Sequence, residues 1–159
     1  MGLLKHTPGK TRIKFCGFTR SSDVDDAVRL GVDALGFVFY APSPRYVSPE
    51  VAATLVGRMP GGVDAVALVV NPTDEEVQRI QDRMPLTLWQ FHGDESPERC
   101  AEIAGGLPWV KAARMKPGFR LEDFSLQYSQ AAGFLLDAFV EGYGGGGHVF
   151  DWSLIPELW

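Results

Sequence analysis

The sequence predicts an α/β protein with a parallel β-sheet, and two observations support this. Short apolar, β-branched runs alternate along the chain with segments of helical pattern. Several runs, such as LGFVF and AVALVV, are almost continuously apolar, so both faces of those strands need cover, as in parallel sheets flanked by helices. Repeated strand–helix units in one sheet are joined by right-handed crossovers.

Six apolar runs are predicted as strands. They are Arg12–Cys16, Ala34–Phe39, Ala65–Val70, Leu86–Phe91, Trp109–Arg114 and Gly133–Asp137. An open doubly wound sheet and a closed barrel both fit this alternation. At a spacing of about 24 residues, eight units would need about 190 residues, close to the minimum of about 200 for a (βα)8 barrel. The 159 residues hold about six units, so a barrel would be cut short.

Helix starts are marked by local capping signals. Ser48 and Ser96 are each followed by proline and glutamate, which is typical of an N-cap, a first helical position and an acidic first turn. Thr73 with Glu76 forms a capping-box pattern. Ser22 is predicted to cap a helix that runs through Val24, Ala27, Val28 and Gly31. Weaker signals predict helices around Leu121–Tyr128 and over the short stretch Asp151–Leu158.

Composition excludes several functional classes. Hydrophobic residues make up 45% and charged residues 22%, with a net charge of −5, which argues against nucleic acid or an anionic membrane as partner. No apolar run is long enough to span a membrane, and the start lacks the apolar core of a secretory signal. Two cysteines are too few for a disulfide framework. We therefore expect a cytoplasmic protein.

Candidate active-site residues lie at the ends of the predicted strands, where α/β proteins bind ligands. Cys16 precedes a glycine there, so its thiol is either a base or nucleophile or a small buried apolar residue. Asp137 ends an apolar run, and partial desolvation favours the protonated form that a general acid needs; bracing a loop is the alternative. Cys100, within a helical pattern, is expected in the core.

Further candidate residues lie in the segments that follow the predicted strands. Arg45, in a proline-stiffened loop, could clamp a carboxylate or remain solvated. His92 is interpreted as a hydrogen-bonded residue at a strand end, and it is also a candidate for substrate binding. Asp94 and Glu95 are assigned to the next helix start. The glycine run that includes Gly144 and Gly145 could cradle a phosphate, although it is not a dinucleotide-binding fingerprint. No metal-ligand spacing occurs.

The strand ends resemble, in order, the motifs of the phosphoribosylanthranilate isomerase family, (βα)8-barrel enzymes of tryptophan biosynthesis. The resemblance spans about residues 12 to 156. It is carried by Arg12–Arg20 (RIKFCGFTR), Gly36–Val47, Leu68–Asn71, Trp89–Glu95, and Leu135–Asp137 with the glycine run and Phe150–Trp152.

The resemblance implies an Amadori rearrangement of N-(5-phosphoribosyl)anthranilate to 1-(2-carboxyphenylamino)-1-deoxyribulose 5-phosphate. It implies that Asp137 is the general acid and Cys16 the general base, that Arg45 faces the anthranilate, and that no cofactor is needed. Gly146 stands where the family usually has threonine, and units seven and eight, whose loops bind the substrate phosphate in the family, are absent.

We therefore expect residues 1–159 to form a single partial barrel domain, with a flexible extension over residues 1–11. The expected partner is a phosphorylated sugar–anthranilate, and the open barrel edges also make a homo-oligomer a candidate assembly. A non-catalytic barrel fragment that needs its missing units, or that self-associates, is the alternative. An open-sheet nucleotide-binding protein is disfavoured because Cys16 and Asp137 fall in register with the family motifs.

Overall fold

The computed structural model describes residues 2–5, 7–140, 143 and 149–156. Its strands form one parallel sheet in the order β1-β2-β3-β4-β5-β6. The strands are β1 (Lys14–Cys16), β2 (Ala34–Phe39), β3 (Asp64–Val69), β4 (Leu88–Phe91), β5 (Trp109–Met115) and β6 (Gly133–Ala138). All six predicted strands are present, with ends shifted by two residues or fewer.

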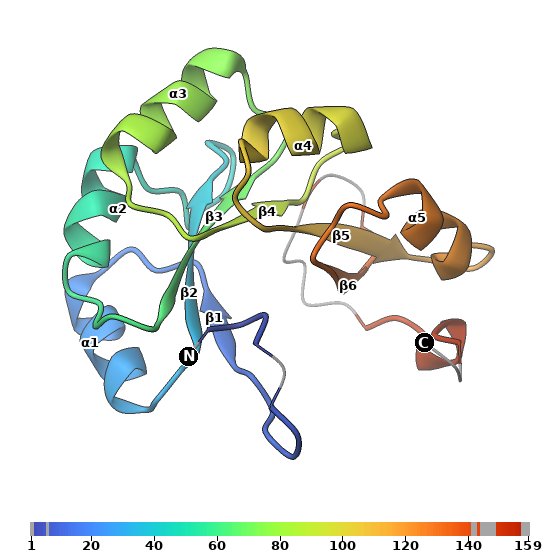
Figure 1. Cartoon of the computed structure of the whole chain (residues 1–159), viewed down its shortest axis with the longest axis horizontal. Helices are drawn as coiled ribbons and strands as arrows, with labels where there is room; N and C mark the ends of the chain where they lie inside the picture. The colour runs from blue at the N-terminus through green and yellow to red at the C-terminus, as the bar shows by residue number, and fades with distance from the viewer. Residues whose placement is uncertain (1, 6, 141–142, 144–148, 157–159) are drawn as a thin grey trace.

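One helix follows each of the first five strands and lies outside the arc of strands (Figure 1). The helices are α1 (Ser21–Arg29), α2 (Pro49–Val56), α3 (Asp74–Arg83), α4 (Pro97–Ala104) and α5 (Leu121–Gln127). Ser48 and Ser96 cap α2 and α4 through their side chains, and Thr73 forms a complete capping box with Glu76. The predicted caps are therefore confirmed for three helices.

One predicted helix cap is wrong, and one predicted helix is present only as a shorter 3-10 turn. Ser22 does not cap α1, because that helix already begins at Ser21 and its N-cap residue, Arg20, makes no side-chain capping hydrogen bond. The stretch Asp151–Leu158 is not a regular short helix over its described part. It contains a single 3-10 turn, η1 (Trp152–Leu154), and residues 157–159 lie outside the described residues.

Apolar side chains pack on both faces of the sheet, as the continuous apolar runs require. The larger cluster lies between strands and helices and contains Trp89, Phe91 and Cys100. Burial raises the pKa of the Cys100 thiol to about 12, in agreement with its predicted core position. A smaller cluster fills the concave side and consists of Ala34, Val66, Leu88 and Val110, with Leu3 packed against it.

The amino-terminal segment contacts the sheet at the end opposite the candidate site. The backbone N–H of Leu3 donates to Asp64 at 2.7 Å, and the guanidinium of Arg12 donates to Asp33 at 2.6 Å. The first of these contacts ties Leu3 to β3, and the predicted flexibility of residues 1–11 stays a prediction.

Within the described residues the sheet does not close. β1 pairs only with β2 and β6 only with β5, so the arc is open between the first and last strands (Figure 1). The fold is an open half-barrel of six parallel strands that alternate with helices, as the number of predicted strands indicated. No helix of the described part has the length and apolar character needed to cross a membrane.

Candidate active site

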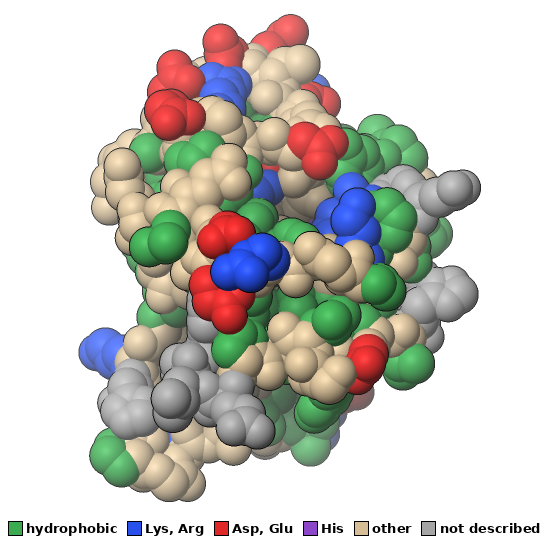
Figure 2. Space-filling model, turned by 90° about the vertical axis from the view of Figure 1, so that its right-hand side faces the viewer, with side chains coloured by type: hydrophobic (Ala, Val, Ile, Leu, Met, Phe, Trp, Pro, Cys, Tyr) green, Lys and Arg blue, Asp and Glu red, His purple; other side chains and the backbone are tan. Residues whose placement is uncertain are grey.

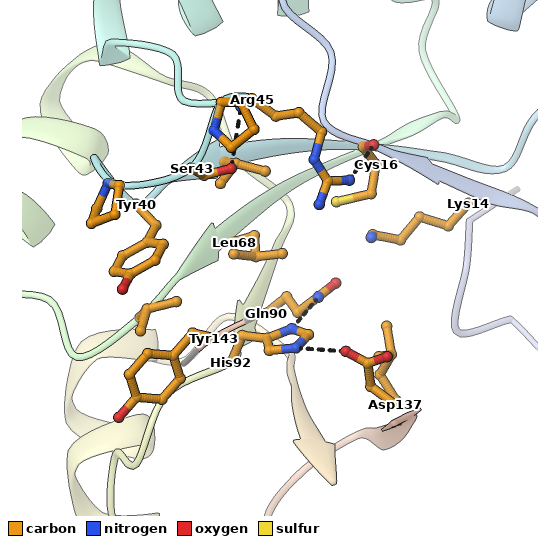
Figure 3. A pocket seen from close by; sticks show the side chains of 15 residues that line it. Lys14, Cys16, Tyr40, Ser43, Arg45, Leu68, Gln90, His92, Asp137 and Tyr143 are labelled. Atoms are coloured by element: carbon orange, nitrogen blue, oxygen red, sulfur yellow. Dashed lines mark hydrogen bonds and ion pairs between the residues drawn. The ribbon is translucent and has the colours of Figure 1, made fainter. Parts of the chain in front are cut away.

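A cavity of about 460 Å³ opens at the carboxyl ends of the strands, on the concave side of the sheet. Strand alternation explains its polar lining. Residues two apart on a strand point to the same face, so Lys14 and Cys16 on β1, and Gln90 and His92 at β4, project into it together (Figure 3). The remaining wall comes from Val38, Tyr40, Pro42, Ser43, Pro44, Arg45, Leu68, Val70, Leu135, Asp137 and Tyr143.

The Cys16 thiol is partly exposed and lies opposite Gly36 in the β1–β2 register. A Cβ atom at Gly36 would lie 2.6 Å from the Cys16 sulfur and 3.1 Å from Lys14 Nζ. The missing side chain of Gly36 therefore makes room for both groups. Because both lie so near one point, the sulfur and the ammonium are no more than about 6 Å apart. Lys14 thus brings a positive charge beside the thiol.

The Asp137 carboxyl group comes from β6, the other open edge, and its side chain is 32% exposed. One of its oxygens accepts the backbone N–H of Ala138 at 2.9 Å, and the other lies 3.1 Å from His92 Nε2. Nδ1 of His92 lies 3.3 Å from the side-chain nitrogen of Gln90. Burial lowers the pKa of His92, although the adjacent Asp137 opposes this.

The Arg45 side chain reaches back from the β2–α2 loop to the end of β1. Its Nη1 lies 3.5 Å from the carbonyl oxygen of Cys16. A Cβ atom at Gly17 would lie 2.5 Å from Arg45 Cδ, and Gly17 has a φ of +97°, so glycine is required there on two grounds. The guanidinium stays exposed at the cavity mouth, where it can meet an anionic or aromatic group.

A buried ion pair holds the loop after β4 in place. Lys111 Nζ lies 2.8 Å from Glu95 Oε2 and donates to the Gly93 carbonyl at 2.6 Å, with both charged side chains at most 2% exposed. The Glu95 carboxylate also accepts the backbone N–H groups of Asn71 and Gly93.

This corrects the assignment of Asp94 and Glu95 to the next helix start, because α4 begins at Pro97 and both residues precede its cap. The Asp94 carboxylate instead accepts the Tyr143 hydroxyl.

Of the predicted site residues, the structure brings Cys16, Arg45, His92 and Asp137 to one cavity. Gly144 and Gly145 lie outside the described residues. Sequence reasoning missed Lys14 and Gln90. Each stands two residues before a predicted site residue in the chain, and that spacing is the signal that could have found them. In the described part of the chain, no cluster of three or more His, Cys, Asp or Glu side chains could hold a metal ion.

Parallel βα units with polar side chains gathered at the carboxyl ends of the strands define a protein of the (βα)8-barrel class. Solved structures of similar fold support this. A phosphoribosyl anthranilate isomerase from Thermotoga maritima superimposes with a TM-score of 0.81 at 38% identity, over 92% of this chain and 70% of that chain. An isomerase solved in complex with reduced 1-(o-carboxyphenylamino)-1-deoxyribulose 5-phosphate gives 0.74 at 35% identity, over 82% of this chain and 66% of that chain.

Sequence comparison identifies the family. The model of N-(5′-phosphoribosyl)anthranilate (PRA) isomerase matches residues 13–159. N-(5′-phosphoribosyl)anthranilate isomerases from Ralstonia nicotianae and Ralstonia pickettii are 59% and 58% identical over 94% of this chain. The chain belongs to the PRA isomerase family. It spans 66% and 65% of the length of these two relatives, just under two thirds.

Proposed function

We propose that this chain carries the acid–base pair of a PRA isomerase and converts N-(5-phosphoribosyl)anthranilate to 1-(2-carboxyphenylamino)-1-deoxyribulose 5-phosphate. The observation that supports the proposal most directly is that Cys16 and Asp137, from the first and last strands, line one cavity. This chemistry needs an acid beside the ring oxygen of the substrate and a base beside its C2′ carbon, so the two groups must face the same bound molecule. Family membership supports the same reaction.

In the proposed reaction Asp137 protonates the furanose ring oxygen while the C1′–O bond breaks. The lone pair of the anilino nitrogen forms the C1′=N bond, and a protonated Schiff base results. The Cys16 thiolate then removes the proton from C2′, and the released electron pair forms the C1′=C2′ bond as the nitrogen becomes neutral. The enolamine gains a proton at C1′ and loses the hydroxyl proton at C2′, which yields the ketone. The imine itself withdraws electrons, so the proposal includes no cofactor.

The remaining groups of the cavity have roles in binding. Arg45 faces the anthranilate ring and its carboxylate, and His92 contributes a hydrogen bond at the acid. A 460 Å³ cavity falls within the usual range for a small-molecule site. The proposed setting is the cytoplasm, with the sugar–anthranilate as small-molecule partner.

A second candidate is a partial barrel that is inactive by itself and pairs with another chain. The unpaired outer edges of β1 and β6 favour it. One solved isomerase of the family, from Thermotoga maritima, is described as monomers generated from a dimeric enzyme.

An assay of phosphoribosylanthranilate turnover tests the proposal, with the loss of anthranilate-type fluorescence as the readout. We would assay the 159 residues alone and also fused at Trp159 to the part of the Ralstonia nicotianae relative that lies beyond the matched region. Cys16→Ser and Asp137→Asn should each abolish nearly all turnover of the active form while substrate still binds, since a hydroxyl is a much weaker base and an amide cannot deliver the proton. Cys100→Ser is the matched control. Near-normal turnover in Cys16→Ser would refute the assignment of the base.

A further inference from the structure

Three side chains form a continuous row from the middle of the sheet to the acid of the cavity. The amide nitrogen of Gln90 lies 3.3 Å from His92 Nδ1, and His92 Nε2 lies 3.1 Å from an Asp137 oxygen (Figure 3). Gln90 is 1% exposed and His92 is 6% exposed. The row is therefore shielded from water except at Asp137, and its hydrogen atoms must be arranged among these three groups.

The carboxylate at the outer end decides where the histidine carries its proton. Burial lowers the pKa of His92, so the ring is neutral near pH 7 and has one N–H and one lone pair. While Asp137 is a carboxylate it can only accept hydrogen bonds, so in that state the N–H of the ring lies on Nε2, facing Asp137. Nδ1 is then an acceptor that requires a donor, and Gln90 is the side chain next to it among the described residues.

The orientation of the Gln90 amide agrees with this requirement. Its nitrogen faces the ring, and its oxygen, Oε1, is buried with no hydrogen-bond partner among the described residues. Turning the amide over would set Oε1 against the lone pair of Nδ1, so two acceptors would face each other. An unpaired buried oxygen is unfavourable. The observed orientation therefore supplies a donor to Nδ1 of His92 and leaves the amide's own oxygen without a hydrogen bond among the described residues.

Other charged groups near the ring act on the pKa of His92, some raising it and one lowering it. Glu95, on the loop after β4, and Asp137, on β6, favour the charged ring, and Lys111, on β5, disfavours it. Lys14 on β1 lines the same cavity. None of these groups contacts Nδ1 in the hydrogen bonds of the described residues, so the tautomer depends on Gln90 and Asp137.

We propose that Gln90 is a positioning residue, which donates to Nδ1 of His92 and thereby holds the neutral ring with its proton on Nε2, directed at Asp137. The catalytic consequence rests on the proposed function. Once Asp137 has given its proton to the ring oxygen of the substrate, the resulting carboxylate accepts the His92 N–H, which Gln90 favours on Nε2.

Nitrogen-15 NMR of the imidazole rings tests the tautomer directly in the 159-residue chain. The chain has three histidines, His6, His92 and His148, and the variants His6→Gln and His148→Gln assign the signals. Near neutral pH, His92 should give the shift pattern of a neutral ring protonated on Nε2. Gln90→Met, which keeps length and apolar volume but removes the donor, should give a mixture of tautomers. Gln78→Met, at an exposed glutamine of α3, is the matched control.

A second variant keeps the test informative if Gln90→Met folds poorly. Gln90→Glu places an acceptor beside Nδ1, so His92 should gain a proton there and stay charged to higher pH than in the unmodified chain, because a carboxylate favours the charged ring. A wild-type ring with its proton on Nδ1 would overturn the proposal. So would an unchanged Nε2–H ring in both folded Gln90 variants.

Kinetics separate this inference from the proposed function. In the active form, Gln90→Met should lower kcat about tenfold, a part of the roughly 10²–10⁴-fold that a general acid contributes, and should leave KM within about twofold. If kcat fell as much in the control variant Gln78→Met as in Gln90→Met, a positioning role for Gln90 would be contradicted. If no form turns over phosphoribosylanthranilate, the proposed function fails, whereas the NMR result still decides the role of Gln90.

Discussion

Side chains at the cavity mouth depend on glycines that make room for them. Gly36 leaves space for the Cys16 sulfur and the Lys14 ammonium, and Gly17 lets the Arg45 side chain lie against the backbone after β1. The contact between Gly17 and Arg45 crosses from the first unit to the second. The position of the guanidinium is thus set by packing, while its nitrogens stay open to a ligand.

Arg45→Ala should therefore weaken substrate binding more than it slows the chemical step. A hydrogen bond to a charged group contributes about 1.5–3 kcal/mol, which is about ten- to a hundredfold in KM or in the dissociation constant of a product analogue. Arg79→Ala, at an exposed arginine of α3 whose ion pair with Glu50 is long at 3.8 Å, should leave both constants unchanged. An unaltered KM and kcat in Arg45→Ala would show that Arg45 is a solvated loop residue.

At the residue scale, the sequence predicted the site residues at the ends of the strands and missed those that lie within the strands. Cys16, His92 and Asp137 could be identified because each follows or ends an apolar run at the site edge. Lys14 and Gln90 lie inside predicted strands, where a polar residue can equally face a helix layer, as Lys111 does on β5. Alternation alone does not decide which face is the concave one.

At the scale of elements, loops after neighbouring strands are joined tightly. A Cβ atom at Gly93 would lie 2.5 Å from Asn71 Oδ1 and 2.7 Å from the backbone nitrogen of Asn71, so the loops after β3 and β4 touch through backbone. Asn71 itself adopts a positive φ of 46° and accepts the Asp94 N–H at 2.7 Å. Beneath this contact the Glu95–Lys111 pair supplies the buried charges that hold both loops.

Lys111→Met should destabilise the fold strongly, because it leaves the Glu95 carboxylate and the Gly93 carbonyl buried without their cation. Removing one partner of a buried pair costs about 3–5 kcal/mol, measurable as a lower urea midpoint at unchanged slope. Lys111→Met combined with Glu95→Gln should recover only part of this, since Asn71 and Gly93 also lose their charged acceptor.

The exposed pair of Arg29 and Asp26 on α1 provides the control. Arg29→Met should cost no more than about 1 kcal/mol. A loss in Lys111→Met as small as that in Arg29→Met would mean that the buried pair adds little to the stability of these loops.

Predicting elements succeeded where the signal was local and failed where it depended on distant contacts. The caps at Ser48, Thr73 and Ser96 are contained within a few residues, and the structure has all three. The predicted start of α1 is wrong because Ser22 resembles a cap residue, whereas the helix already begins at Ser21 and its N-cap residue, Arg20, makes no side-chain capping bond. The ion pair of Glu95 and Lys111 joins residues 16 apart in sequence, and no local pattern indicates it.

For the whole molecule, the proposed acid and base stand on the two strands that have only one neighbour each. Cys16 belongs to β1 and Asp137 to β6, and no hydrogen-bonded ladder joins these strands among the described residues. Their separation depends on the curvature of four intervening strands. The open sides also expose apolar residues. Ile13 and Phe15 near β1 are 45% and 43% exposed.

The face with α5 and the carboxyl-terminal segment shows further hydrophobic side chains among charged ones (Figure 2). Phe139 and Trp152 are among the large apolar residues exposed in the structure. Unpaired parallel strand edges with apolar neighbours favour pairing with another chain. The edges and this face together explain why a half-barrel is expected to bind a complementary piece or a second copy.

We therefore expect the isolated 159-residue polypeptide to self-associate and to show little isomerase turnover, because its edges are open and the distance from Cys16 to Asp137 is not held by strand pairing. Adding the region of the Ralstonia nicotianae relative beyond the match, as a fusion or as a separate peptide, should reduce self-association and raise turnover. Sedimentation and the fluorescence assay on the same samples measure both. Cys16→Ser in the complemented form distinguishes turnover by this chain from contamination. A stable monomer of the 159 residues with ordinary turnover would show that the open edges impair neither assembly nor catalysis, and that six units suffice to hold the acid and the base.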